Sequence, residues 1–428
     1  MMKAKVITLG CKVNQYESEA MLSSLLQHGF AAAEDKETAD VVILNSCTVT
    51  AESDRKVRQI FRRAKKDNPD AVMVLTGCMA QAFPEDARRL EEADIILGTS
   101  NRKRLVPDLL AFLSARQRII DIAPHTNDEK FENLNVENFT GRTRAFVKIE
   151  DGCNRFCSYC IIPYARGPIR SKDPKTVIKE ITSLVENGYK EIILTGIHTG
   201  KYGKDINYTF EQLLKEIIKI KNLYRIRISS IEINELTDPI LNLIKDNQVI
   251  AKHLHIPLQS GSDKILKLMD RKYDLKFYKD RIEKIRKMIK DISITTDLIV
   301  GFPNENEKDM EDTLKFLKEI KFTKIHTFPY SKREGTKAAS MENQIDETIK
   351  RKRVKTVLEL SDQLEQDFYQ SKLNETEEVI IEQTKDGKSY GYTSNYIKVE
   401  INSPLKPNEV ISVKINKVNN KKVTGKII

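Results

Sequence analysis

Residues 153–160 read Cys-Asn-Arg-Phe-Cys-Ser-Tyr-Cys, so Cys153, Cys157 and Cys160 stand in one short loop. The C-x3-C-x2-C spacing can hold one metal cluster, but it supplies only three ligands, whereas a structural zinc site uses four. The six histidines stand outside this loop, at positions 28, 125, 198, 253, 255 and 326. The spacing therefore favours a [4Fe-4S] cluster in which one iron lacks a protein ligand and can bind a small molecule. A zinc site is the weaker alternative.

The loop directly follows the first of six predicted strands that alternate with amphipathic helices. These strands lie near residues 144–149, 190–195, 224–231, 252–257, 292–300 and 322–328. Helices are predicted between them at 174–187, 209–221, 238–246, 263–290 and 307–320. Regular β-α alternation predicts parallel strands. We therefore expect a partial (β/α)6 barrel over residues 144–345, with its chemistry at the carboxyl ends of the strands.

The other three cysteines, Cys11, Cys47 and Cys78, each end a short apolar run. Amphipathic segments follow these runs at residues 14–28, 53–67 and 84–93. This alternation predicts a doubly wound parallel sheet over residues 1–122. Ligands of such sheets bind beyond the carboxyl ends of the strands, so the three cysteines are expected to converge there and to hold a second cluster. Three separately buried structural cysteines are the alternative.

The remaining segments complete an α/β chain with an all-β end. Residues 123–143 are polar and aperiodic and are predicted to be a linker, and 346–373 are predicted to form a connecting helix. Residues 374–428 alternate apolar and polar positions between turns, which predicts a small β-barrel of the oligonucleotide-binding type. The length of 428 residues fits about three domains, and 40% hydrophobic with 31% charged residues is a globular composition.

No apolar run approaches the ~20 residues that cross a bilayer, and the N-terminus lacks the pattern of a signal peptide. We therefore expect no membrane association and a cytoplasmic location, where thiols stay reduced. The net charge is +10. Residues 55–66 hold seven basic and no acidic residues, and residues 406–428 hold six lysines and one glutamate. Solvated surface is the simplest interpretation of both runs, but beside an oligonucleotide-type barrel the second run favours contact with phosphates.

Several segments resemble the radical S-adenosylmethionine methylthiotransferase family. CNRFCSYCIIPYARG resembles the cluster loop of radical S-adenosylmethionine enzymes, and LGCKVNQYES, NSCTVT and GCMAQ resemble the three cysteine motifs of methylthiotransferases. Residues 391–399, GYTSNYIKV, resemble the TRAM domain that these enzymes carry. Lys12-Val13 after the first cysteine, with GIHTGKYG at 196–203, is similar to the branch that modifies N6-threonylcarbamoyladenosine in tRNA.

The resemblance implies two [4Fe-4S] clusters. The cluster at Cys153, Cys157 and Cys160 would bind S-adenosylmethionine and cleave it to a radical. A second cluster, held by the other three cysteines, would handle the sulfur, and a second S-adenosylmethionine would supply the methyl group. The product would carry a methylthio group on C2 of the modified adenosine at position 37. The implied partners are a tRNA anticodon loop and an electron-donating reductase.

Further contacts to S-adenosylmethionine are implied at strand ends. Tyr159 would lie by the adenine, and Gly196 by the methionine amino group. The other implied contacts are Glu232, Gln259, Asp297 and Gly301. Turn formation or helix capping explains the same positions equally well.

Three other functions stay open. The same chemistry could act on N6-isopentenyladenosine in tRNA or on a ribosomal protein residue. A non-catalytic iron–sulfur electron carrier with an RNA-binding tail would need fully ligated clusters and no S-adenosylmethionine pocket. The sequence leaves open the sulfur source, the electron donor, the tRNAs chosen, the residues that contact the base, and the oligomeric state.

Overall fold

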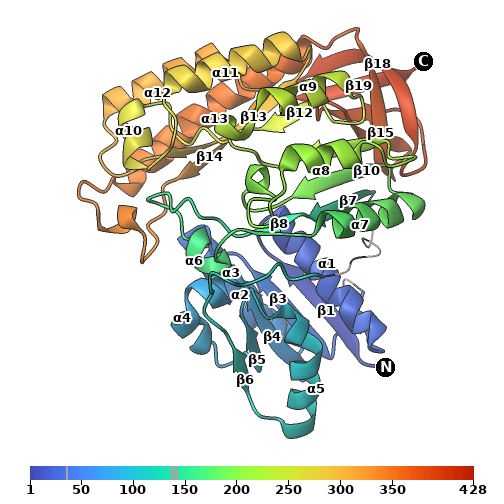
Figure 1. Ribbon diagram of the computed structural model, residues 1–428, viewed down its shortest axis with the longest axis vertical. Coiled ribbons are helices and arrows are strands. Elements are labelled where there is room, and N and C mark those ends of the chain that lie inside the picture. The colour runs from blue at the N-terminus through green and yellow to red at the C-terminus, as the bar shows by residue number, and fades with distance from the viewer. Residues whose placement is uncertain (35–36, 135, 137–138, 140–142) are drawn as a thin grey trace.

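The chain forms an N-terminal α/β domain, a central partial barrel and a closed C-terminal β-barrel, which run from blue to red in Figure 1. The predicted α/β class, with an all-β C-terminus, is confirmed. The computed structural model describes residues 1–34, 37–134, 136, 139 and 143–428. Within these ranges, no helix has the length and apolar content needed to cross a membrane.

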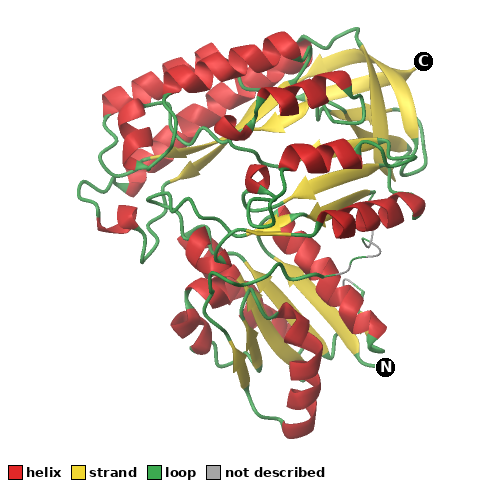
Figure 2. Ribbon diagram, in the orientation of Figure 1, coloured by secondary structure: helices red, strands yellow, loops and turns green. Residues whose placement is uncertain are grey.

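The N-terminal domain is a parallel sheet with helices on both faces (Figure 2). Its six strands, in the spatial order β2-β1-β3-β4-β5-β6, are β1 (Lys3–Thr8), β2 (Ala31–Ala32), β3 (Val41–Ser46), β4 (Val72–Gly77), β5 (Ile95–Leu97) and β6 (Ile119–Asp121). One face packs against α1 (Lys12–Gln27) and α5 (Leu105–Ala115), and the other against α2 (Ala51–Asp67), α3 (Cys78–Ala82) and α4 (Pro84–Arg88). Every residue of β3 and β4 is buried, as expected for strands covered on both faces.

The central domain contains the six predicted parallel strands in two sheets. These are β7 (Arg144–Lys148), β10 (Glu191–Thr195), β11 (Arg225–Ile228), β12 (His253–His255), β13 (Ser293–Val300) and β14 (Lys324–Pro329). The sheet β11-β10-β7 meets the sheet β12-β13-β14 through isolated bridges between β11 and β12. The outer face carries five helices (Figure 1), which are α7 (Pro174–Glu186), α8 (Phe210–Ile217), α9 (Asp238–Asp246), α11 (Leu275–Met288) and α12 (Glu307–Ile320). The barrel is therefore partial, with β7 and β14 as its outer strands.

Three predicted helices differ from the observed ones. The helix predicted at 209–221 ends at Ile217 of α8. The helix predicted at 84–93 ends at Arg88 of α4, although Leu90 and Ala93 beyond it stay buried. The helix predicted at 263–290 is two helices, α10 (Asp263–Leu268) and α11. Asp270 between them has a φ of +59°, and the Asp274 side chain accepts a hydrogen bond from the backbone N–H of Phe277, which caps α11. Apolar periodicity continues across this break, so it could not reveal the boundary.

The described residues of the predicted linker form neither helix nor strand, yet they pack on the barrel. Val136 and Phe139 are buried in its core, and the backbone N–H of Phe139 donates to the Tyr189 hydroxyl at 2.7 Å. After the barrel, α13 (Glu347–Gln370) lies along β14, where Ser361 accepts a hydrogen bond from the backbone N–H of Ile325 at 3.0 Å.

The C-terminal β-barrel is closed in the order β15-β16-β17-β19-β18. Its strands are β15 (Thr376–Lys385), β16 (Lys388–Thr393), β17 (Lys398–Ile401), β18 (Val410–Asn419) and β19 (Lys422–Ile427). Arg227 of β11 fixes it to the central domain by donating to the backbone carbonyls of Thr393 and Ser394 at 3.2 and 3.1 Å. The same guanidinium group pairs with the buried carboxylate of Glu191 at 3.0 Å.

A buried charge network joins the N-terminal domain to the central one. Glu17 of α1 is fully buried and lies 3.0 Å from Arg102, 2.9 Å from Lys148 and 2.5 Å from Arg166. Burial alone would raise the pKa of Glu17, but these three cations lower it to about 2. Asp151 joins the network at 3.0 Å from Lys148. The carboxylates are therefore held ionised at the domain boundary.

Glu17→Gln should lower the free energy of unfolding by about 3–5 kcal/mol, because three buried cations then face a neutral amide. The folded pKa of Glu17 lies below its unfolded value of about 4.3, so its contribution is complete above that pH and is lost as the pH falls toward 2. Urea unfolding between pH 7 and pH 3 measures both effects. Glu52→Gln, at an exposed pair with Arg55, is the control and should leave stability unchanged. Equal stability of Glu17→Gln and wild type would contradict the network.

Candidate functional site

The loop that carries Cys153, Cys157 and Cys160 lies between β8 (Glu150–Asp151) and α6 (Ile162–Arg166). Gly152 begins it with a φ of +88°, and a Cβ at this position would lie 1.9 Å from the backbone oxygen of Pro168. Further along, Ser158 binds the opposite half of the barrel, because its N–H donates to the Met269 carbonyl at 3.1 Å and its hydroxyl to the Leu268 carbonyl at 2.8 Å. The three sulfurs are therefore held on a fixed backbone.

The three thiols of this loop lie close enough to influence one another. Burial, together with the neighbouring Cys160 and Cys157, raises the pKa of Cys153 to about 12. Burial likewise raises the pKa of Cys160 to about 12. Buried thiols ionise only beside a strong positive charge, and metal ligands must be thiolates. The donor set therefore fits an iron–sulfur cluster, whose irons would supply that charge.

Arg271 connects this cysteine loop to the predicted Glu232. Its guanidinium group donates to Cys157 Sγ at 3.5 Å and forms an ion pair with Glu232. Arg155, within the loop, lies 3.2 Å from the same carboxylate. The structure thus brings Glu232 to the edge of the loop, held by two cations.

The other predicted contacts lie around the carboxyl ends of the strands. Tyr159 is half-buried against the apolar cluster that includes Phe302 and Tyr330, and burial raises its pKa well above the ordinary value. Gly196 follows β10, and a Cβ there would lie 2.7 Å from Glu150 Oε2. This close approach explains the glycine.

Gln259, Asp297 and Gly301 lie together at the end of β13. Gln259 has a φ of +69°; its N–H donates to the Asp297 carbonyl and its carbonyl accepts from Ile299, both at 2.9 Å. The Asp297 carboxylate lies 3.1 Å from His255 Nε2. Gly301 donates its N–H to Glu305 Oε1 at 2.8 Å, so this amide already has a partner.

His198 is a site residue that the sequence analysis missed. Its Nδ1 lies 3.7 Å from Cys153 Sγ, and its Nε2 lies 2.6 Å from Glu235 Oε1. His198 follows β10 and lies 38 residues beyond Cys160 in the sequence. Because β10 pairs with β7, the strand that precedes the cysteine loop, His198 comes to the edge of that loop. The GIHTG segment, which follows β10 in the sequence, could have indicated His198. Among the described residues, no three His, Cys, Asp or Glu side chains are grouped to hold a single ion.

The second cysteine set lies at one edge of the N-terminal sheet. Cys11 precedes α1, Cys47 follows β3, and Cys78 begins α3 after β4. A Cβ on Gly10 would lie 2.9 Å from Cys47 Cβ, which shows how closely the first two loops approach. Burial, together with Cys47 and Cys11, raises the pKa of Cys78 to about 12 against the opposing charge of Arg166. The three thiols are therefore neighbours.

Arg166 connects the two cysteine sets. It ends α6, directly after the cluster loop, and its Nε donates to Cys78 Sγ at 3.2 Å. Its other nitrogens donate to Asn14 Oδ1 at 2.7 Å and to Glu17. Burial opposes its charge, but Cys78, Glu17 and Asp151 together raise the pKa of Arg166 well above the ordinary value. A permanent cation therefore stands beside the second set, where it favours the thiolate form.

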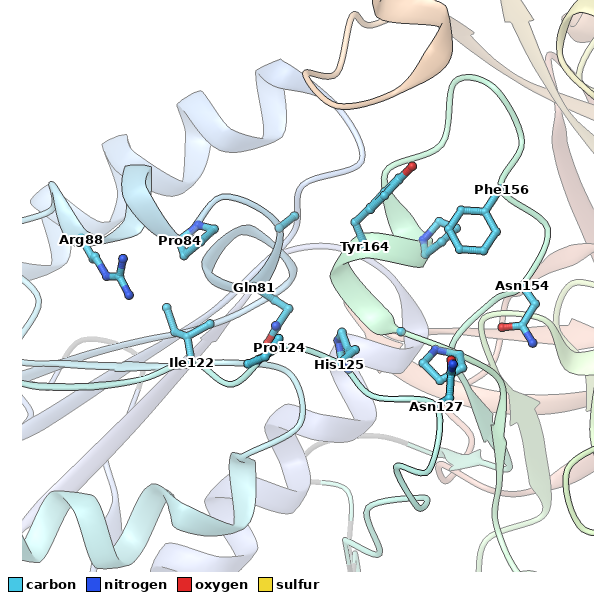
Figure 3. Close-up of a pocket in the computed structure, with 14 residues that line it drawn as sticks. Gln81, Pro84, Arg88, Ile122, Pro124, His125, Asn127, Asn154, Phe156 and Tyr164 are labelled. Carbon is cyan, nitrogen blue, oxygen red and sulfur yellow. The ribbon is translucent and has the colours of Figure 1, made fainter.

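A surface pocket of about 740 Å3 lies between the two domains (Figure 3). Gln81 of α3 and Arg88 of α4 line one side, and Phe156 of the cluster loop and Tyr164 of α6 line the other. The rings of Phe156 and Tyr164 meet edge to face at 5.7 Å, and about half of each side chain is exposed. The pocket is thus bounded by segments that adjoin both cysteine sets.

A partial (β/α)6 barrel with three cysteines directly after its first strand defines an enzyme of the radical S-adenosylmethionine class, which uses S-adenosylmethionine and a [4Fe-4S] cluster. Residues 147–317 match the Radical SAM superfamily, and residues 3–98 match "Uncharacterized protein family UPF0004". A methyltransferase of this class, TsrM from Kitasatospora setae, has a similar fold, with a TM-score of 0.58, 13% identity, and coverage of 79% of this chain and 74% of that one.

Closer relatives identify the family. The threonylcarbamoyladenosine tRNA methylthiotransferase MtaB of Bacillus subtilis is 45% identical over 92% of this chain and 88% of its own. The tRNA-2-methylthio-N(6)-dimethylallyladenosine synthase of Clostridium botulinum is 36% identical over 98% of this chain and 96% of its own. The chain therefore belongs to the radical S-adenosylmethionine methylthiotransferase family.

Gly152→Ala should destabilise the protein by about 1–3 kcal/mol more than Gly335→Ala. Both glycines have a positive φ, +88° and +84°, so both variants carry the same backbone strain. Only at Gly152 does the new methyl group meet a backbone oxygen, since no atom lies within 4 Å of a Cβ at Gly335. Thermal unfolding, with iron content after reconstitution, measures the difference. Equal losses in the two variants would show that the loop tolerates displacement.

Proposed function

We propose that this enzyme adds a methylthio group to C2 of N6-threonylcarbamoyladenosine at position 37 of tRNA. The observation that carries the proposal is the hydrogen bond from Arg166 to Cys78 Sγ. Arg166 follows the cluster loop closely in the sequence, so this bond brings the second cysteine set next to the segment after that loop. Sulfur insertion at an unactivated C–H needs a radical source and a sulfur-bearing centre near one base, and this arrangement can provide both. The name of the Bacillus subtilis relative supports the same substrate.

The dimethylallyladenosine synthase of Clostridium botulinum makes N6-isopentenyladenosine the second candidate substrate. Its identity of 36%, against 45% for the Bacillus subtilis relative, favours threonylcarbamoyladenosine. A ribosomal protein substrate and a non-catalytic electron carrier have less support, because both relatives are named for tRNA modification.

In this proposal Cys153, Cys157 and Cys160 hold the [4Fe-4S] cluster that binds S-adenosylmethionine. When bound, the two cofactors supply a 5′-deoxyadenosyl radical. Arg271 orients Cys157 and Glu232 through its paired contacts, and Tyr159, within the loop, lies by the adenine of the cofactor.

The strand-end residues divide into two kinds. Gly196 and Gly301 shape the backbone. There is no room for a side chain at Gly196, and the backbone N–H of Gly301 is already hydrogen-bonded to Glu305. Gln259 keeps its side chain for the cofactor, since its backbone groups are already hydrogen-bonded. Asp297 reaches the cofactor with a carboxylate that also contacts His255 Nε2 at 3.1 Å.

Cys11, Cys47 and Cys78 hold a second [4Fe-4S] cluster, which carries the sulfur to be transferred. Arg166, which ends the helix after the first cysteine loop, offsets the negative charge of the thiolates in this second set. A second S-adenosylmethionine gives the methyl group, and a separate reductase supplies the electron. We place the reaction in the cytoplasm.

The C-terminal β-barrel, in the role of a TRAM domain, contacts the tRNA backbone. In the run 406–428, Lys421 and Lys422 pair with Asp362 and Glu400. The exposed lysines that remain available for phosphates are Lys406, Lys414, Lys417 and Lys426. In the run 55–66, by contrast, several basic side chains pair with acids outside the run, such as Arg62 with Glu92 at 3.2 Å. The C-terminal surface is therefore the better RNA site.

Anaerobic reconstitution should load about eight irons per chain and give 5′-deoxyadenosine on addition of S-adenosylmethionine and reductant. Cys157→Ser and Cys47→Ser should each lower the iron content to about four. Only Cys157→Ser should also abolish 5′-deoxyadenosine, because Cys47 belongs to the second set. Iron and sulfide analysis with chromatography of the nucleoside checks this. An iron-loaded wild type that never cleaves S-adenosylmethionine would favour the electron carrier.

Deletion of the gene should remove the methylthio group from N6-threonylcarbamoyladenosine in total tRNA and leave methylthiolated N6-isopentenyladenosine at its normal level. Mass spectrometry of digested nucleosides distinguishes the two. Re-expression of the wild-type chain, but not of Cys157→Ser, should restore the product. Persistence of the methylthio group on threonylcarbamoyladenosine would refute the proposed substrate.

A further inference from the structure

The last strand of the central domain, β14, exposes two residues on its inner face. Ile325 is buried in the apolar core beneath the helices, whereas His326 is exposed and Phe328 is 45% exposed. Because successive side chains of a strand point to opposite faces, His326 and Phe328 share the face directed away from the helices. An aromatic ring and an imidazole therefore stand together on the inside of the partial barrel.

Phe328 lies at the carboxyl end of β14, close to the segments of the first cysteine set. It is the register partner of Ile299 in β13. Ile299 packs against the apolar cluster that includes Phe302 and Tyr330, and Tyr159 of the cysteine loop packs against the same cluster. The exposed ring of Phe328 is thus one strand away from residues that adjoin the cysteine loop.

His326 provides polar atoms beside this ring. Its ring centroid lies 5.7 Å from that of His255. Both nitrogens of His255 are engaged, since Nδ1 lies 3.0 Å from Thr295 Oγ1 and Nε2 lies 3.1 Å from Asp297 Oδ2. The His326 nitrogens, by contrast, have no hydrogen-bond partner within the described ranges. His326 therefore rests against a fixed ring and keeps its own nitrogens available to a ligand.

The chemistry of this face fits one kind of occupant. Its apolar part is a single ring, whereas a docked protein helix uses several apolar anchors at helical spacing. Lys324, on the same face, pairs with Glu365 at 3.1 Å and is therefore already neutralised. An exposed aromatic ring beside an available imidazole is instead typical of sites for an unpaired base, which stacks on the ring and forms hydrogen bonds through its edge.

We infer that Phe328 and His326 bind the adenine of the target nucleotide, with Phe328 against one face of the base and His326 hydrogen-bonded to its edge. The inference rests on the proposed function and deepens it, because it names the surface that receives the base. His255, which Thr295 and Asp297 hold in place, is a positioning residue for His326. Every base presents a π face for stacking, so this surface serves either candidate adenosine and does not select between their N6 substituents.

The test compares the binding of two anticodon stem-loop RNAs to the reconstituted protein, one with threonylcarbamoyladenosine at position 37 and one with an abasic residue there. By fluorescence anisotropy, wild type should bind the first RNA about 10-fold more tightly, the scale of base–aromatic stacking. Phe328→Ala should bind both RNAs with nearly the same Kd. Phe328→Tyr should retain the difference, because it keeps the ring. His326→Ala should lower the difference to about 3-fold, because one hydrogen bond is lost.

Phe277→Ala is the matched control, because it removes a ring of α11 that is 44% exposed. It should distinguish the two RNAs as wild type does. The 5′-deoxyadenosine formed without RNA should be unchanged in all of these variants, since it reports the cofactor site and not the base. Iron content and thermal stability show that each variant is folded and loaded.

A Phe328→Ala variant that prefers the base-containing RNA as strongly as wild type would overturn the inference and leave the proposed function intact. Loss of RNA-free 5′-deoxyadenosine in this variant, with the preference for the base retained, would assign Phe328 to the cofactor and would also overturn it. A wild type that methylthiolates the isopentenyladenosine RNA and not the threonylcarbamoyladenosine RNA would refute the proposed substrate alone. Loss of the preference for the base in Phe328→Ala, measured on the isopentenyladenosine RNA, would then still support the inference.

Discussion

The burial of Glu17 among three cations is the constraint on which the site depends. Arg166 belongs to this network and also donates to Cys78, so the charge pairing that holds the domains together fixes the second cysteine set against α6. Ions removed from water tolerate little displacement, since each partner that moves away leaves an unpaired charge. The two cysteine sets are thus positioned by electrostatics at the boundary, beside Tyr16 and Ala20 of α1, which join the apolar core of the central domain.

Parallel β-α alternation explains why each set gathers at all. In the N-terminal sheet, the neighbouring strands β1, β3 and β4 end at one edge, and a cysteine after each reaches the same place. In the barrel, the loop after β7 is held by residues of α10 from the opposite half, which closes it over the strand ends. In both domains, the cysteines lie beyond the carboxyl ends of parallel strands. They are dispersed in the sequence of the N-terminal domain and clustered in one loop of the central domain.

Local patterns predicted most strands and helices, because these depend on periodicity, but not the short strands β2 and β6. The direction of parallel strands was the basis for expecting the cysteines of each set at strand ends, where they lie. The break between α10 and α11 was missed, since Asp270 and Asp274 interrupt the backbone without interrupting the apolar pattern. Long-range partners were missed as well. His198 meets Cys153, and Arg166 meets Cys78 across 88 residues, only after the strands and domains have assembled. The predicted linker also gave no sign that Phe139 enters the barrel core.

The docking of the C-terminal β-barrel through Arg227 restricts how the chain can use it. The guanidinium group binds backbone carbonyls of the small barrel and a buried carboxylate of the central domain. Rotation of the small barrel relative to the central domain would therefore leave the carbonyls and the carboxylate without this hydrogen-bond partner. The small barrel is a rigid spacer and not a flexible tether. Under the proposed function, an RNA bound by its lysines would have to span a set distance to the cysteines, which would select substrates by size as well as by chemistry.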